Sequence, residues 1–184
     1  MNFLRSIILT DYKIEKLVIN LRDIFWNDFF IYFTKLGDWY IVLLLSILVA
    51  VLFYFYKKRK LILPFLIVIL GSGIMTVITK LLVCRVRPGN DIALYVEKLP
   101  SFPSAHASLI LAFFGFLIYC FWQFNICLKY KIILSIVFLT IILLIGFSRI
   151  YLGVHYFSDI IGGYLVGLMW ILIAIYISQK TNRC

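Results

Sequence analysis

Five long runs of uncharged, mostly apolar residues limit what this chain can fold into. They cover residues 39–56, 61–79, 104–122, 132–148 and 160–178. A helix needs roughly 20 residues to cross a bilayer core, and only helices or closed barrels satisfy their backbone in lipid. Because the runs do not alternate between apolar and polar residues, they exclude barrel strands. We therefore expect an all-α, polytopic membrane bundle of about five transmembrane helices.

The segment before these runs has a different character. Residues 1–38 hold five basic and five acidic residues, with apolar side chains at near-helical spacing. This pattern predicts one or two amphipathic helices lying in the membrane interface. The alternative, a sixth span, would bring Arg22, Asp23 and Asp28 toward the bilayer centre. No linker divides the chain, so we expect one domain over residues 1–184, with an interfacial segment (1–38) and a transmembrane bundle (39–178).

Basic residues gather at one end of the predicted bundle. Four occupy positions 57–60, two occupy positions 129 and 131, and two occupy positions 180 and 183, with no acid among them. The positive-inside rule places these segments, and the C-terminus, in the cytoplasm. The same rule explains the net charge of +10, so we expect no nucleic-acid partner. The loops around 84–103 and 149–159 then face the exterior.

Three polar clusters lie on that outer side, and the first contains Lys80, Arg85, Arg87 and Pro88. Seven residues make two helical turns, so Lys80 and Arg87 are expected to share one helix face, with Pro88 ending the helix. Lysine supplies a point charge and arginine a planar fork that grips two phosphate oxygens. These residues predict an anion site; the alternative is that they are snorkelling side chains at the interface.

The second cluster is Pro103-Ser104-Ala105-His106, directly before an uncharged run. Proline and serine are typical of helix starts, so the third span is expected to begin here. Its free N–H groups and positive dipole end would favour phosphate. His106 in the first turn could then protonate a leaving oxygen. Alternatively, the histidine packs at the interface as an amphipathic side chain.

The third cluster consists of Ser148-Arg149, His155 and Asp159. The spacing of His155 and Asp159 places them on one face if the last span is already helical there. A carboxylate bonded to one imidazole nitrogen fixes the tautomer and leaves the other nitrogen free to attack. Arg149 adds a third cation for a phosphate. The alternative is a structural His–Asp bond that caps the last helix.

Taken together, the three motifs resemble those of the type-2 phosphatidic acid phosphatase superfamily, which shares its site with vanadium haloperoxidases. They appear here as Lys80-(six residues)-Arg87-Pro88, Pro103-Ser104-Ala105-His106 and Ser148-Arg149-(five residues)-His155-(three residues)-Asp159. The resemblance implies these roles: phosphate binding by Lys80, Arg87, Arg149, Ser104 and the N–H of Ala105; acid catalysis by His106; nucleophilic attack by His155, forming a phosphohistidine; and support of His155 by Asp159.

The resemblance also implies a membrane lipid phosphatase that needs no metal and no cofactor, in the bacterial inner membrane with its site facing the periplasm or exterior. Candidate substrates are undecaprenyl diphosphate, phosphatidylglycerophosphate, phosphatidic acid and lipid A phosphates. Small members of the family favour the polyprenyl diphosphate. The loop from Gly89 to Phe102, with Asp91, Glu97 and Lys98, is too short to build a large lid over the lipid headgroup. A rival interpretation is an anionic-lipid transporter or flippase, which predicts charges spread through the membrane depth.

Several details stay open in the sequence. The family usually has glycine where this chain has Ala105; alanine is harmless only if the backbone there is helical. Gly163 and Gly167 form a GxxxG pair that predicts close helix packing, inside the bundle or between protomers. A monomer and a homo-oligomer are equally compatible with this pair. The four cysteines, Cys84 and Cys184 among them, have no metal-type spacing and are expected to stay reduced.

Overall fold

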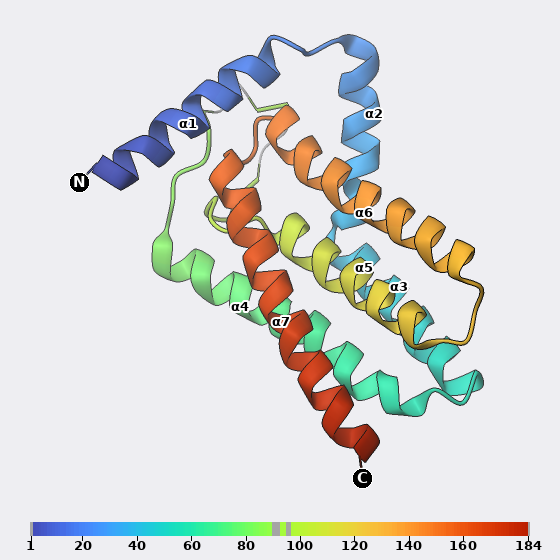
Figure 1. The fold of residues 1–184 in the computed structure, drawn as a ribbon. Coiled ribbons are helices and arrows are strands. Elements are labelled where there is room, and N and C mark those ends of the chain that lie inside the picture. The colour runs from blue at the N-terminus through green and yellow to red at the C-terminus, as the bar shows by residue number, and fades with distance from the viewer. Residues whose placement is uncertain (1, 90–92, 95–96, 184) are drawn as a thin grey trace.

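A computed structural model describes residues 2–89, 93–94 and 97–183, and across these ranges its regular structure is helical (Figure 1). The all-α prediction is therefore confirmed. Asp91 and Cys184 lie outside the described residues. The main helices are α1 (Asn2–Ile19), α2 (Ile24–Thr34), α3 (Trp39–Phe55), α4 (Ile62–Val83), α5 (Ala105–Gln123), α6 (Leu128–Tyr151) and α7 (Phe157–Arg183).

Most of the predicted spans are present as single helices. Within the described part of the chain, four stretches are long and apolar enough to cross a membrane: Arg59–Val83, Ala105–Gln123, Leu128–Tyr151 and Phe157–Lys180. Helix α3 is shorter, with 17 residues. It passes only together with the segment Ile24–Gly37, from which it is bent by 51°. The predicted count of about five spans therefore agrees with the structure if this bent pair crosses as one unit.

Residues 1–38 form two helices, α1 and α2, which differ in their surroundings. Helix α1 lies across one end of the bundle, as an interfacial helix would (Figure 1), whereas α2 joins α3 in the bent, apolar pair. The charges that argued against a span lie mostly outside α2. Arg22 and Asp23 precede the helix, and Asp23 caps it by accepting from the N–H of Phe25 at 2.9 Å. Only Asp28 remains as a charged residue inside α2.

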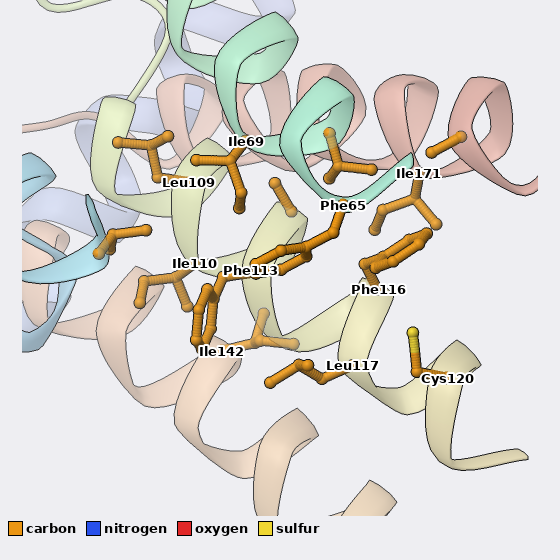
Figure 2. Packing of buried hydrophobic residues seen from close by; sticks show 14 of the residues in the cluster. Phe65, Ile69, Leu109, Ile110, Phe113, Phe116, Leu117, Cys120, Ile142 and Ile171 are labelled. Carbon is orange, nitrogen blue, oxygen red and sulfur yellow. The ribbon is translucent and has the colours of Figure 1, made fainter. Parts of the chain in front are cut away.

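Helix α5 forms the centre of the bundle, packed against α4, α6 and α7. Figure 2 shows side chains from these helices meeting around Phe113 and Phe116. Phe65 of α4 lies with its ring centroid 5.8 Å from that of Phe113 and 5.9 Å from that of Phe116. Such aromatic pairs stabilise a core beyond their buried area. This packing fixes the ends of α4, α5 and α7, where the polar clusters lie.

The GxxxG pair packs inside the chain. A Cβ on Gly163 would lie 2.5 Å from the carbonyl oxygen of Ser104, and one on Gly167 would lie 2.7 Å from that of Ser108. Both glycines are buried and let α7 approach the backbone of α5 closely. Of the two predicted roles for this pair, the structure supports packing within the bundle, and the pair is not exposed as a surface for a second protomer.

Candidate active site

Lys80 lies in the last turn of α4 and is buried, with 3% of its surface exposed. Its Nζ donates to the carbonyl oxygens of Pro100 at 2.5 Å and Ser101 at 3.2 Å. These bonds tie the end of α4 to the chain that leads into α5. The ammonium group is thereby held at the end of the bundle where the second cluster begins.

Arg87 lies at the site, but it is not part of the helix that was predicted to contain it. Helix α4 ends at Val83 because Cys84 adopts a left-handed conformation, with φ 48° and ψ 36°. Lys80 and Arg87 are therefore not on one helix face, and the prediction that Pro88 ends this helix was wrong. The turn instead directs the Arg87 guanidinium toward the third cluster, where Nη1 donates to the carbonyl oxygen of Val154 at 2.6 Å.

The second cluster forms a helix start, as predicted. Ser104 is the N-cap of α5, and its N–H donates to the carbonyl oxygen of Asp159 at 3.0 Å. The Ser104 hydroxyl is buried and has no hydrogen-bond partner among the described residues. Ala105 is the first residue of α5 and has no positive φ, so this position does not require the conformational freedom of glycine.

His106 is paired with a carboxylate from the start of α3. Its Nε2 lies 3.0 Å from Oδ1 of Asp38, and the hydroxyl of Tyr40 donates to Oδ2 of the same carboxylate at 2.8 Å. Gly37 gives the imidazole room, because a Cβ there would lie 2.7 Å from Cδ2 of His106. A carboxylate in this position orients an imidazole.

His155 lies in the connection between α6 and α7 and is almost fully buried. Its Nδ1 is 3.3 Å from Oδ2 of Asp159, and its Nε2 is 3.2 Å from Nη1 of Arg87. A guanidinium can only donate, so we assign the lone pair to Nε2 and the ring proton to Nδ1. Burial and the charges of Arg149 and Arg87 hold the pKa of His155 well below its usual range. The ring is therefore neutral, as a nucleophile must be.

Asp159, at the start of α7, is surrounded by donors. Its Oδ2 accepts from the hydroxyl of Ser101 at 2.5 Å and from the N–H of Tyr156 at 2.9 Å. Its Oδ1 accepts from Nη1 of Arg85 at 2.6 Å. These bonds satisfy a carboxylate that is fully buried and fix its orientation toward His155. The predicted His155–Asp159 contact is present, although α7 begins only at Phe157.

The same arginine connects Asp159 to the N-terminal helix. Nη2 of Arg85 lies 2.8 Å from Oδ2 of Asp11, a buried residue of α1. Asp11 also accepts from the N–H and the hydroxyl of Ser158, at 2.9 Å and 2.5 Å. Arg85 thus lies between two carboxylates, and its guanidinium supports Asp159 directly.

Arg149 lies in the last turn of α6, and its side chain is fully buried. Its Nη1 donates to the hydroxyl of Thr34 at 3.0 Å, and its Nη2 pairs with the carboxylate of Glu97. The other oxygen of Glu97 lies 2.6 Å from Nη2 of Arg87. One carboxylate therefore bridges two of the cations that the sequence assigned to phosphate, so the pair of arginines has the spacing to hold a single anion.

An open cavity of about 460 Å³ lies beside Arg87 and Glu97. Its described lining includes Cys84, Arg87, Glu97 and Lys98. Cys84 is an exposed free thiol there. Because Arg87 and Glu97 contribute both to this cavity and to the buried cluster, the cavity adjoins the cluster of cations.

The predicted site residues thus come together at one end of the bundle, but sequence reasoning missed several of their partners. These are Asp11, Thr34, Asp38 and Ser101, together with the contact of Arg85 to Asp159 and of Glu97 to both arginines. One signal was available for Asp38: a Gly-Asp pair directly before an apolar run marks a chain break at a helix start.

Comparisons with known proteins identify the family of this chain. The PAP2 superfamily model matches residues 60–183. Phosphatidylglycerophosphatase B of Bacillus subtilis is 30% identical over 175 residues, which cover 94% of this chain and 85% of the relative.

Two solved structures share the fold. The crystal structure of a transmembrane PAP2-type phosphatidylglycerolphosphate phosphatase from Bacillus subtilis matches with a TM-score of 0.87 and 28% identity, over 98% of this chain and 88% of that one. The Aquifex aeolicus LpxE structure matches with a TM-score of 0.72 and 25% identity, over 90% of this chain and 94% of that one. The chain therefore belongs to the PAP2 superfamily, as an integral membrane lipid phosphatase.

Proposed function

We propose that this phosphatase removes the terminal phosphate of a phospholipid through a phosphohistidine at His155. The preferred substrate in this proposal is phosphatidylglycerophosphate. The observation that carries the proposal is the setting of that imidazole. Its Nδ1 faces Asp159 and its Nε2 faces Arg87, so the lone pair points at the cations that would hold a phosphate. A purely structural His–Asp pair would not require the free nitrogen to lie among arginines.

The substrate phosphate would occupy the position now taken by the carboxylate of Glu97. Arg87 and Arg149 already grip one anion there, and a phosphate offers them the same pairs of oxygens. The hydroxyl of Ser104, buried without a partner among the described residues, is available as a further donor. The N–H of Ala105 at the start of α5 and the ammonium of Lys80 would complete the binding site.

The first chemical step would transfer the phosphoryl group to the protein. Nε2 of His155 attacks phosphorus, the bond from phosphorus to the lipid oxygen breaks, and His106 donates a proton to that oxygen. Nδ1–H stays bonded to Asp159, which stabilises the positive charge that the ring gains. Asp38 holds His106 in its orientation for the proton transfer.

In the second step, water would release the phosphate. His106, now neutral, takes a proton from a water molecule whose oxygen attacks phosphorus. The phosphorus–nitrogen bond breaks, and its electron pair returns to Nε2 of His155. The proposal uses no metal, because three cations and a helix N-terminus can balance the charge that develops on the phosphate oxygens.

An apolar groove supports a lipid as the substrate. It measures about 430 Å³ and lies between α3 and α4, with Trp39, Val42 and Leu43 on one wall and Ile74 and Val77 on the other. Trp39 directly follows Asp38, the partner of His106. A lipid could enter this groove laterally from the membrane. With one acyl chain in the groove, the lipid phosphate would lie near the histidines.

The choice among lipids follows the relatives. The Bacillus subtilis relative and the Bacillus subtilis crystal structure are both named for phosphatidylglycerophosphate. We therefore propose this lipid in place of the polyprenyl diphosphate that the family resemblance favoured. The orientation follows the positive-inside rule, with the site facing the exterior of a bacterial inner membrane and the C-terminus in the cytoplasm. The candidate site residues lie at one end of the bundle, which favours a hydrolase over a flippase.

Phosphate release from a lipid panel tests the proposal. Purified protein in detergent is given phosphatidylglycerophosphate, phosphatidic acid, undecaprenyl diphosphate and a lipid A phosphate, with and without a chelator. We expect the fastest release from phosphatidylglycerophosphate, no effect of the chelator, and a loss of roughly 10⁴-fold or more in His155→Ala. Thr79→Val, a change at the half-buried residue next to Lys80 in α4, serves as the matched control.

A second readout tests the intermediate. Substrate labelled in its phosphate should leave an acid-labile, alkali-stable label on the wild type and on Thr79→Val, but not on His155→Ala. Release that persists in His155→Ala would exclude this nucleophile, and loss of activity with the chelator would exclude the metal-free mechanism. No release from any lipid would exclude the hydrolase.

A further inference from the structure

A basic pocket lies at the end of the bundle opposite the candidate active site. The connection between α3 and α4 carries four consecutive cations at positions 57–60. Three of them line a polar pocket of about 300 Å³ that is also bordered by the ends of α5 and α7. Its polar lining residues are Lys57, Lys58, Lys60, Tyr119, Gln123 and Ser178.

An apolar cavity adjoins this pocket. It measures about 390 Å³ and is lined by side chains from α3, α5 and α6, among them Leu52, Phe53, Leu117 and Phe138. Lys58 and Phe124 line both spaces. The Nζ of Lys58 lies 5.2 Å from the ring centroid of Phe124, so the cation stands where the polar and apolar parts meet.

We propose that this combined site binds an anionic phospholipid of the adjacent leaflet. The lipid phosphate would lie among Lys57, Lys58 and Lys60, and one acyl chain would enter the apolar cavity. No carboxylate belongs to the described lining of either space, so the charge of the site is complementary to an anion. Basic pockets between transmembrane helices are a known setting for lipid headgroups.

The fourth cation of the segment has another role. The guanidinium of Arg59 lies 4.0 Å from the ring centroid of Tyr54 on α3, and Arg59 does not line the pocket. The three lysines are therefore the ones oriented for a headgroup. A lipid held by them would contact α3, α5 and α7 together and would link helix ends that also position the site at the other end of the bundle.

The test uses phosphatidylglycerol as the probe, because its phosphodiester is not a substrate of a phosphomonoesterase. Detergent-purified protein is titrated with phosphatidylglycerol or phosphatidylcholine, and retained lipid is counted by native mass spectrometry. We expect phosphatidylglycerol to bind the wild type at least about tenfold more tightly than the triple variant Lys57→Gln, Lys58→Gln, Lys60→Gln. Leu52→Trp, which fills part of the apolar cavity, should weaken retention as well.

The matched control compares Lys58→Gln with Lys129→Gln, an exposed lysine on the same face of the bundle. Only Lys58→Gln is expected to weaken binding. An equal loss of phosphatidylglycerol binding in the two variants would show that only the general surface charge matters, and it would contradict the proposed site. Equal retention of phosphatidylcholine and phosphatidylglycerol would contradict recognition of an anion. Displacement of the lipid by millimolar inorganic phosphate, together with unchanged binding in Leu52→Trp, would indicate a site for phosphate and not for a lipid.

Discussion

The carboxylate of Glu97 lies 2.6 Å from Nη2 of Arg87, and its other oxygen is paired with the buried Arg149. In the proposed pose a substrate phosphate would use the same two guanidinium groups, so it would have to displace Glu97 before binding. The apparent affinity for a phosphate is then lowered by the fraction of protein in which the carboxylate occupies the site.

Glu97→Gln is therefore expected to tighten phosphate binding. The amide keeps the shape of the side chain but removes the negative charge that competes with substrate. We expect the inhibition constant of inorganic phosphate to fall by about tenfold and KM to fall with it, while kcat changes little. Asp28→Asn, an exposed acid on α2, is the control. An unchanged KM and inhibition constant in Glu97→Gln would show that the carboxylate does not compete.

The contact between Asp38 and His106 leads to a prediction about leaving groups. Asp38→Asn keeps a hydrogen-bond partner for His106 but removes the negative charge beside the imidazole, which would stabilise the proposed proton donor less well. We expect kcat for a lipid alkoxide leaving group to fall by roughly tenfold to a hundredfold. A p-nitrophenyl leaving group needs little protonation and should be affected much less. Tyr40→Phe, which removes only the outer bond to Asp38, is the milder control. Equal losses for both substrates would contradict proton donation through this pair.

The chain of contacts from Asp159 through Arg85 to Asp11 predicts a role for α1. Asp11 is buried and contacts Arg85 and Ser158 instead of the proposed phosphate-binding groups, so it would act by positioning Arg85. We expect Asp11→Asn to lower kcat by about tenfold with KM within twofold, and Asp11→Glu to restore part of the loss. Lys13→Gln, exposed on the same helix, should leave both constants unchanged. A change in KM alone would assign Asp11 to substrate binding instead.

The depressed pKa of His155 has a consequence for the pH profile. Burial disfavours the imidazolium, and the charge of Arg149 adds to the effect, so the neutral nucleophile persists below the usual histidine pKa of about 6.5. The acid limb of kcat/KM should therefore lie below that pH. Arg149→Gln removes one cation, raises the pKa of His155 and should move the limb to higher pH, besides weakening substrate binding. A limb that stays in place would show that another group controls it.

The sequence predicted the features that lipid and local geometry impose. Charge-free runs of sufficient length must be helices in a membrane, and Ser104 before such a run marks its first turn. The spacing of His155 and Asp159 brings the two side chains together. These inferences depend only on residues that are close together in the chain, so they can be made from the sequence.

The partners that the sequence missed are distant along the chain. Asp38 and His106 are separated by 68 positions, and Thr34 and Arg149 by 115, so only the packed bundle brings them together. The end of α4 before Arg87 was missed for a local reason. Cys84 adopts a left-handed backbone, which glycine adopts readily and other residues rarely do, so a helix through Cys84 was the natural but wrong expectation.

The close approach of α7 to α5 leads to a prediction about stability and position. A Cβ on Gly163 would lie 2.5 Å from the carbonyl oxygen of Ser104 and 2.9 Å from the Cβ of Ala107, and neither is the end of a flexible side chain. We expect Gly163→Ala to destabilise the bundle by about 1–3 kcal/mol and to raise KM, because Ser104 moves with α5. Gly89→Ala, where a Cβ meets nothing within 4 Å, is the matched control. Thermal unfolding in detergent measures the first effect, and a Tm for Gly163→Ala as high as that of Gly89→Ala would contradict the packing described here.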